Sequence, residues 1–460
     1  MIPLHRLADL SARDLAWFRP ALDLLDALPS TADRRLQTFL SPKLPLYIAR
    51  APGRLDVMGG IADYSGARVL ELPLACATFA LVQAQQGEHC DIATRRAKQW
   101  GFFSIELPLA EPAELAAWFQ EHEAERWASY VVGVVQALLA GSAATGGLRI
   151  LIDSSVPEGR GVASSAALEV AVCAAVATSL GIDISAAELA VLCQTVENQV
   201  VGAPCGIMDQ MTSACGKRDR LLQLRCQPGT VEGYVEIPSG FRFYGVDSGL
   251  SHAVSGADYA TVRTAAFMGC RMLAAEAGFA GRYLANLTPA EFARFSGCLP
   301  DTMSGAEFLE RYRGISDTAT VVLPDRRYPV RRAAQHPVEE QDRVDRFAKL
   351  LADLSQRPNS ATEIGRLMYG SHESYSACGL GSDGTDRLVE LVKDVGAARG
   401  LFGAKITGGG SGGTVAVFGR SDAEHLVREI AARYGAETGR ETRVFAESGP
   451  GAAETGVLLR

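Results

Sequence analysis

The chain has 460 residues, which is too long for one compact core and predicts two or three domains. Apolar residues make up 47% and charged residues 21%, an ordinary composition for a soluble protein. The net charge of −8 argues against nucleic-acid and anionic-membrane partners, because both need a basic face.

Cysteine usage and hydropathy indicate the compartment. The ten cysteines are scattered singly with no C-x-x-C pair, which favours reduced thiols over a disulfide framework or a structural zinc site. The first residues mix charges with apolar residues, so they lack the apolar segment of a signal peptide. No uncharged apolar run reaches membrane-spanning length. We therefore expect a soluble, cytoplasmic protein.

The first part of the chain predicts a helical extension over residues 1–45, followed by a short strand over 46–51. A glycine-rich loop over 52–66 follows, and polar ligands could enter it. Within the loop, Arg54 and Asp63 are either ligand-binding groups or a structural ion pair and a turn aspartate. After it, the pattern predicts paired strands over 69–74 and 78–83, and an amphipathic helix over 127–139.

A strand over 148–152 then passes through Gly159 and Gly161 into a long helix rich in alanine and valine, which runs toward Leu180. A glycine turn that opens a helix presents free backbone N–H groups and the positive end of the helix dipole, so it forms an anion site. The alternative is a simple glycine turn in which Ser164 or Ser165 caps a buried helix.

A further helix is predicted over 186–200, and Glu197 falls beside its apolar stripe. A surface glutamate is the default there, and a partly buried metal ligand is the alternative. Gly and Pro break the helix, and Asp209 then stands among apolar residues, where an unpaired carboxylate is costly. That aspartate is either functional or a structural group bonded to the backbone.

A second unit of strands and helices begins near residue 236, where we place a domain boundary. Tyr259 lies on its first helix. Near the end, Gly408, Gly410 and Gly413 match G-x-G-x-x-G, but an apolar β-branched run follows them, so they join two strands and do not open a Rossmann helix. No Walker A, protein-kinase or zinc-protease motif occurs. Any nucleotide site must therefore use another architecture.

The three glycine-rich stretches, in their order, resemble the GHMP kinase family. PEGRGVASSAA is similar to its second, ATP-binding motif and ITGGGSGG to its third. The first stretch, GRLDVMGGIADYSG, is similar to the galactokinase signature G-R-x-N-x-x-G-E-H-x-D-Y-x-G, and the longer strings resemble the kinase part of plant L-arabinokinases. The resemblance covers residues 46–460.

This resemblance implies an α+β fold of two domains with the active site in the cleft between them. A ribosomal-S5-like domain over residues 46–235 would bind ATP and sugar, and a ferredoxin-like α/β sandwich domain would follow over 236–460. It also implies two substrates or cofactors, ATP and Mg²⁺. The positions that it assigns to ATP are Gly159, Gly161, Ala163, Ser164 and Ser165. Those that it assigns to Mg²⁺ are Ser165 and Glu197.

The resemblance makes Asp209 and Arg54 the catalytic pair beside the anomeric hydroxyl of the sugar. The positions that it assigns to sugar binding are Gly60, Ile61, Asp63, Gly206 and Tyr259. Physically, Asp209 can accept the proton of the attacking hydroxyl, and Arg54 can keep that carboxylate ionised and stabilise the transferring group.

This chain departs from the galactokinase pattern at three positions: Gly60 and Ile61 stand where that pattern has Glu-His, and Asp56 stands where it has Asn. By the resemblance, the missing Glu serves the 6-hydroxyl of the sugar. L-arabinopyranose has the ring stereochemistry of galactose without that hydroxymethyl group, so an apolar corner predicts L-arabinose as the substrate. The alternatives are a galactose or uronic-acid 1-kinase and a non-catalytic sugar sensor.

Overall fold

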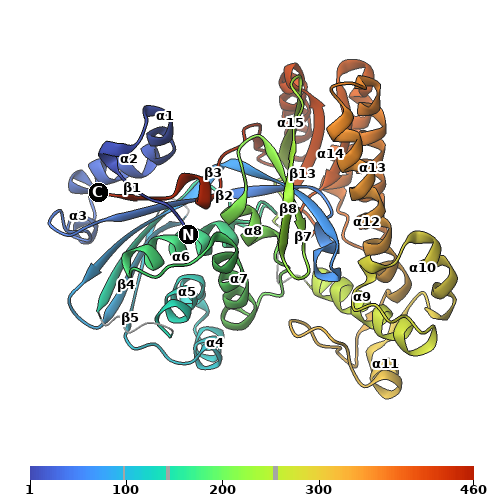
Figure 1. Ribbon diagram of the computed structural model, residues 1–460, viewed down its shortest axis with the longest axis horizontal. Helices are drawn as coiled ribbons and strands as arrows, with labels where there is room; N and C mark the ends of the chain where they lie inside the picture. The colour runs from blue at the N-terminus through green and yellow to red at the C-terminus, as the bar shows by residue number, and fades with distance from the viewer. Residues whose placement is uncertain (97–98, 141–145, 252–256) are drawn as a thin grey trace.

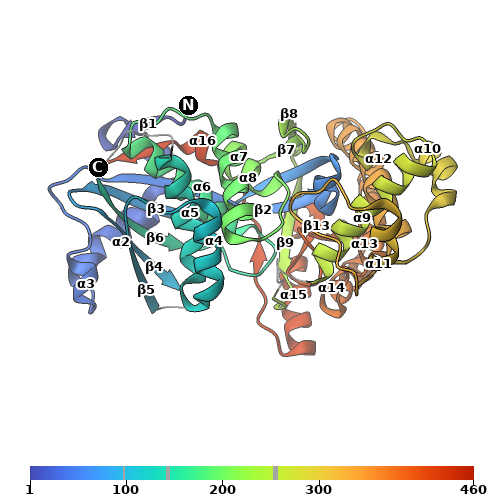
Figure 2. The same cartoon turned by 90° about the horizontal axis from the view of Figure 1, so that it is seen from below.

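The computed structural model describes residues 1–96, 99–140, 146–251 and 257–460. Two lobes lie side by side, each built on one β-sheet with helices packed against it (Figures 1 and 2). The first lobe contains the larger sheet, in the order β1-β15-β2-β3-β6-β4-β5, with β7 paired to β3 and β8 to β7. Its strands are β1 (Leu4–Arg6), β2 (Tyr47–Met58), β3 (Arg68–Gln85), β4 (His89–Arg96), β5 (Gln99–Glu106), β6 (Gly147–Ser154), β7 (Arg220–Arg225), β8 (Thr230–Glu236) and β15 (Val457–Leu459).

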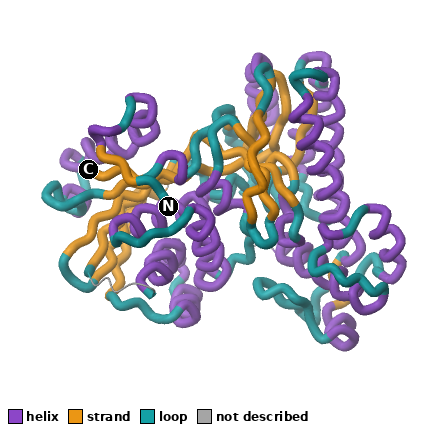
Figure 3. The backbone as a smooth tube through the Cα atoms, viewed as in Figure 1, coloured by secondary structure: helices purple, strands orange, loops and turns teal. Residues whose placement is uncertain are grey.

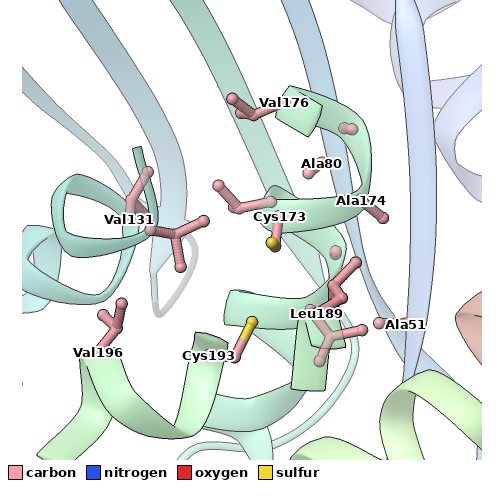
Figure 4. Close-up of a cluster of buried hydrophobic side chains, with 14 of the residues drawn as sticks. Ala51, Ala80, Val131, Cys173, Ala174, Val176, Leu189, Cys193 and Val196 are labelled. Carbon is pink, nitrogen blue, oxygen red and sulfur yellow. The ribbon is translucent and has the colours of Figure 1, made fainter. Parts of the chain in front are cut away.

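One helix forms the centre of the first lobe. This helix, α6 (Ser164–Ser179), is apolar around nearly its whole circumference, which is typical of a fully buried helix. Figure 4 shows Cys173, Ala174 and Val176 of α6 between the strands and the neighbouring helices. The helices of this lobe besides α6 are α4 (Pro112–Glu121), α5 (Ser129–Leu139), α7 (Ala186–Val196), α8 (Met208–Cys215) and α16 (Ala452–Thr455).

The second lobe contains a four-stranded sheet in the order β12-β13-β9-β14, and Figure 3 shows long helices beside these strands. Its strands are β9 (Phe241–Asp247), β12 (Leu401–Ile406), β13 (Thr414–Arg420) and β14 (Val444–Phe445), with a separate pair β10 (Met303–Ser304) and β11 (Arg327–Tyr328). Its helices are α9 (Ala257–Glu276), α10 (Pro289–Phe295), α11 (Gly305–Tyr312), α12 (Val330–Asp353), α13 (Ala361–Ala377), α14 (Asp383–Val395) and α15 (Glu424–Thr438).

Both ends of the chain meet in the first lobe. Strand β1 pairs parallel with β15, which pairs antiparallel with β2, so the last strand lies outside the lobe that residues 236–445 build. The extension predicted over residues 1–45 contains three short helices, α1 (Ala12–Leu15), α2 (Arg19–Ala27) and α3 (Arg34–Gln37), in addition to β1. Its buried Phe18 and Leu36 pack with Ile48 and Leu81 of the sheet, which fastens the extension to the first lobe.

Two predictions of local structure were wrong. The strands expected over 69–74 and 78–83 are one continuous strand, β3, which pairs with β2 and not with itself. Pro73 is tolerated inside it because it lies opposite a register shift between Pro52 and Arg54, where the ladder is already interrupted. The loop expected over 52–66 is shorter than predicted, because β2 continues to Met58 before the 3₁₀ turn Gly60–Ser65.

Other predictions of local structure were confirmed. The glycine stretch 408–413 joins β12 to β13 in an antiparallel pair, as expected of a strand-to-strand turn. Helix α7 ends at Val196, and the chain continues as a π-helical turn, Glu197–Val201. None of the helices within the described ranges is long and apolar enough to cross a membrane.

Candidate active site

A cavity lies where the two lobes meet, and it collects nearly all the positions that the three glycine-rich stretches had singled out. The residues that line it are Arg54, Ile61, Asp63, Gly159, Gly161, Ala163, Ser164, Ser165, Glu197, Pro204, Cys205, Gly206, Met208, Asp209, Tyr259, Gly408 and Gly409. Segments as distant in sequence as β2, α6, α8, α9 and the β12–β13 turn therefore share one site.

The glycine stretch before α6 forms the wall expected of an anion site. Gly159 and Gly161 have φ values of 68° and 67°, in the left-handed region that favours glycine. Ala163 takes the same left-handed conformation at the N-cap of α6, and no side chain caps the helix there. The alternative in which a serine caps the helix is therefore not observed, and Ser164 and Ser165 instead line the cavity in its first turn.

Arg54 and Asp209 form the central ion pair of the cavity. Arg54 donates from Nε to Asp209 Oδ1 at 2.8 Å, and its Nη2 lies 2.6 Å from the same oxygen. Nη1 donates to the carbonyl of Gly161 at 2.8 Å, so the guanidinium also holds the glycine stretch in place. Although burial opposes the charge, Asp209 and Glu71 raise the pKa of Arg54 above its usual value. Arg54 thus remains a cation inside the protein.

Asp63 and Gly206 show a close fit at the other end of the cavity. A Cβ atom at Gly206 would lie only 1.7 Å from Asp63 Oδ2, so only glycine fits at this position. Burial raises the pKa of Asp63 to about 7, and the nearby Arg263 opposes that rise. Its Oδ1 already accepts a hydrogen bond from the backbone of Tyr64, which leaves Oδ2 toward Gly206 as the oxygen available to a ligand.

Glu197 is buried, so the surface alternative is wrong. The π-helical turn carries this side chain into the cavity wall, where it is 2% exposed. Burial raises its pKa to about 7, and a hydrogen bond from Ser165 opposes the rise. Gln210 Nε2 donates to Glu197 Oε2 at 2.6 Å and to Glu169 Oε2 at 3.2 Å, which orients the carboxylate from behind.

Ser165 and Glu197 together fit a magnesium ion. Mg²⁺ prefers oxygen ligands and is usually held by one or two carboxylates, with water and substrate phosphates completing the shell. A serine oxygen and a carboxylate stand in contact here at the N-terminus of α6, beside the anion site. Within the described residues no group of three or more His, Cys, Asp or Glu side chains could hold a metal on its own, so phosphate oxygens would have to complete such a site.

Gly60 is the one predicted site residue that does not line the cavity. It is buried behind the cavity and absent from its lining, whereas its neighbour Ile61 does line it. A Cβ atom at Gly60 would lie 1.6 Å from the hydroxyl of Tyr375, so a side chain at this position would point away from the cavity. Of the two neighbours, Ile61 and not Gly60 therefore presents an apolar side chain to the cavity.

Sequence reasoning missed several residues of the site. Pro204, Cys205 and Met208 line the cavity between Glu197 and Asp209, and their position between two predicted residues was the available signal. Gly408 and Gly409 line it from the second lobe. These two lie in the stretch ITGGGSGG, which had been matched to the third motif of the family but to which no site residue had been assigned.

Comparison with known proteins identifies the family. Residues 129–217 match the model of the GHMP kinases N terminal domain, and residues 348–436 match that of the GHMP kinases C terminal. An L-arabinokinase of Arabidopsis thaliana is 40% identical to this chain. The aligned part covers 90% of this chain and 46% of that protein, so the chain spans about half the length of that relative. A galactokinase of Chloroflexus aggregans is 30% identical over 86% of this chain and 90% of its own length.

Solved structures show the same fold. The crystal structure of Lactococcus lactis galactokinase complexed with galactose superimposes with a TM-score of 0.75, over 93% of this chain and 99% of that one, at 20% sequence identity. The two-domain α+β architecture implied by the three motifs is thus confirmed. The chain belongs to the GHMP kinase family.

Proposed function

We propose that this protein is an ATP-dependent sugar kinase that converts L-arabinose and ATP to L-arabinose 1-phosphate and ADP. The observation that carries the proposal is that the Arg54–Asp209 pair and the N-terminus of α6 line the same cavity. A carboxylate that can accept a proton and a helix N-terminus that can bind phosphate then face the same space. The relatedness to an L-arabinokinase and to galactokinases supports the same reaction class.

The side chains support an in-line phosphoryl transfer. The oxygen of the sugar C1 hydroxyl forms a bond to the γ-phosphorus of ATP, the bond from that phosphorus to the β–γ bridging oxygen breaks, and ADP leaves. Asp209 accepts the hydroxyl proton, and Arg54 offsets the negative charge of the transferring group. Arg54 is prepared for this role because its guanidinium is fixed by Asp209 and by the carbonyl of Gly161.

The remaining walls position the two substrates. The backbone of Gly159 to Ala163 and the first turn of α6 receive the triphosphate. Ser165 and Glu197 would hold Mg²⁺, which when bound neutralises phosphate charge. Asp63, Gly206 and Tyr259 border the end of the cavity where a sugar would lie. The domains would meet near residue 236, where β8 ends and the second sheet begins.

The choice of L-arabinose over galactose rests on Ile61. This buried, apolar side chain lines the cavity two residues before Asp63. An apolar wall leaves the hydroxymethyl group of galactose without a hydrogen-bond partner and costs a pentose nothing. A uronate would need a cation at the same corner, and Ile61 provides none.

A panel of sugars with ATP and Mg²⁺ tests the proposal. We expect L-arabinose to give the highest kcat/KM, with galactose slower and galacturonate inactive, measured as sugar 1-phosphate formed. Galactose turned over much faster than arabinose would reassign the protein as a galactokinase. If no sugar is phosphorylated although sugar still binds, the protein is a sensor and the enzymatic proposal is wrong.

A further inference from the structure

Another residue fills the space that a side chain at position 60 would need. The hydroxyl of Tyr375, on α13, lies 1.6 Å from the point where a Cβ atom of residue 60 would stand, and its Cζ atom lies 2.8 Å from that point. Gly60 itself has φ of 41°, in the left-handed region. The tyrosine hydroxyl can therefore occupy this place only because residue 60 has no side chain.

The hydroxyl of Tyr375 connects the two walls of the cavity. It accepts a hydrogen bond from the backbone N–H of Ile61 at 2.8 Å and donates to the carbonyl of Gly408 at 3.0 Å. Ile61 belongs to the turn after β2 and Gly408 to the turn after β12, and both line the cavity. Because Tyr375 is completely buried, no water can replace these bonds at low cost.

A buried ion pair supports the same walls. The carboxylate of Asp56 accepts hydrogen bonds from Lys405 Nζ at 2.7 Å, from the N–H of Gly60 at 3.1 Å and from that of Gly408 at 3.2 Å. Lys405 Nζ also lies 5.1 Å from the centre of the Tyr375 ring. Asp56, Lys405 and Tyr375 are each 0% exposed, so this buried cluster fixes the backbone at Gly60 and Ile61 in one wall and at Gly408 in the other.

We propose that Tyr375 is a positioning residue that determines sugar specificity. It occupies the place of a side chain at position 60 and holds Ile61 against the sugar, and so keeps the corner too apolar and too narrow for a hydroxymethyl group. The proposal rests on the function proposed above. It also means that Gly60→Glu alone cannot convert the enzyme into a galactokinase, because the new side chain would meet Tyr375 and Asp56 before it reached the cavity.

The first test is Tyr375→Phe, which keeps the ring and removes the hydroxyl. We expect kcat/KM for L-arabinose to fall about tenfold through KM, while the value for galactose stays constant or rises. The matched control is Tyr244→Phe, because Tyr244 is also completely buried and its hydroxyl donates to a backbone carbonyl, that of Arg420, on the far side of the second sheet. The control should leave the ratio of the two sugars unchanged.

Equal losses on both sugars, or no loss on either, would overturn the proposal, since a purely structural role moves both together. A second measurement is independent of turnover: Gly60→Ala should lower the melting temperature less in the Tyr375→Phe background than in the wild type, because part of the clash is gone. Additive effects would contradict the packing on which the proposal depends. If the wild type phosphorylates neither sugar, the proposed function fails, and this stability cycle still decides the packing.

Discussion

Asp56→Asn is the substitution for which the structure gives the clearest expectation. It removes the negative charge from a pair whose members lie 2.7 Å apart with neither side chain exposed. Removing one partner of such a pair costs about 3–5 kcal/mol, because the other charge stays buried without compensation. Here the remaining charge is the ammonium of Lys405, which connects β12 to β2.

A neighbouring carboxyl sets the expected value within that range. Burial and the charge of Asp56 raise the pKa of Glu71 well above its usual range, and the nearby Arg54 opposes that rise. Once Asp56 is neutral, Glu71 can ionise more easily and partly replace the lost charge. We therefore expect a loss near the lower end, about 3 kcal/mol, and a larger one in the double variant Asp56→Asn/Glu71→Gln.

Urea unfolding followed by circular dichroism measures this loss, provided that the transition is single. The control is Asp56→Asn/Lys405→Met, which removes both charges and should recover most of the stability. A loss below about 1 kcal/mol for Asp56→Asn, or a double variant as unstable as the sum of the two single variants, would refute the reasoning. Either result would mean that the pair is not the buried, mutually dependent unit described above.

Three further changes test other parts of the site. Asp209→Asn removes the proposed proton acceptor and should lower kcat by about 100-fold to 10,000-fold in an ADP-release assay; an unchanged kcat would exclude that role. Ala163→Gly relieves a residue held at φ of 59° and should raise the free energy of unfolding by about 1 kcal/mol; a decrease would contradict the strain. Burial raises the pKa of Asp63 from 3.8 to about 7, so the folded state binds the extra proton between these values. This proton should make the free energy of unfolding fall by up to about 1.4 kcal/mol per pH unit as pH rises through that window. Asp63→Asn should remove this part of the slope in urea titrations and leave the part due to Glu197, whose pKa burial also raises to about 7.

Local sequence was sufficient to predict the elements that need only neighbouring residues. The strand, the two glycines and the apolar helix α6 follow one another in the chain, so their backbone preferences alone predict an anion site there. The strand-to-strand turn at 408–413 was predicted correctly for the same reason, because β-branched residues flank it on the C-terminal side. The motifs also brought together most of the residues that line the cavity.

Other properties depend on partners far away in the chain. Helical periodicity alone left Glu197 at the surface by default, although the family resemblance assigned it to Mg²⁺. The π-helical turn, with Gln210 behind it, turns the side chain inward. The prediction of paired strands over 69–74 and 78–83 was wrong, because residues 74–76 of β3 bulge opposite Gly53 of β2 and let one strand continue past Pro73. Neither a change of helical pitch nor a β-bulge leaves a periodic signal in the sequence.

Gly60 and Ile61 show most clearly which properties depend on local sequence and which on tertiary structure. The sequence by itself determined that an apolar Ile61 and a side-chain-free Gly60 replace two polar residues of the galactokinase pattern. Only the tertiary structure decided that Gly60 faces Tyr375, whose hydroxyl bonds to Ile61 from 314 residues further along the chain. It also decided that Asp56 pairs with Lys405, which is 349 residues away. The physical reason is that the direction of a Cα–Cβ bond and the burial of a charge are set by packing between the lobes, which no local pattern encodes.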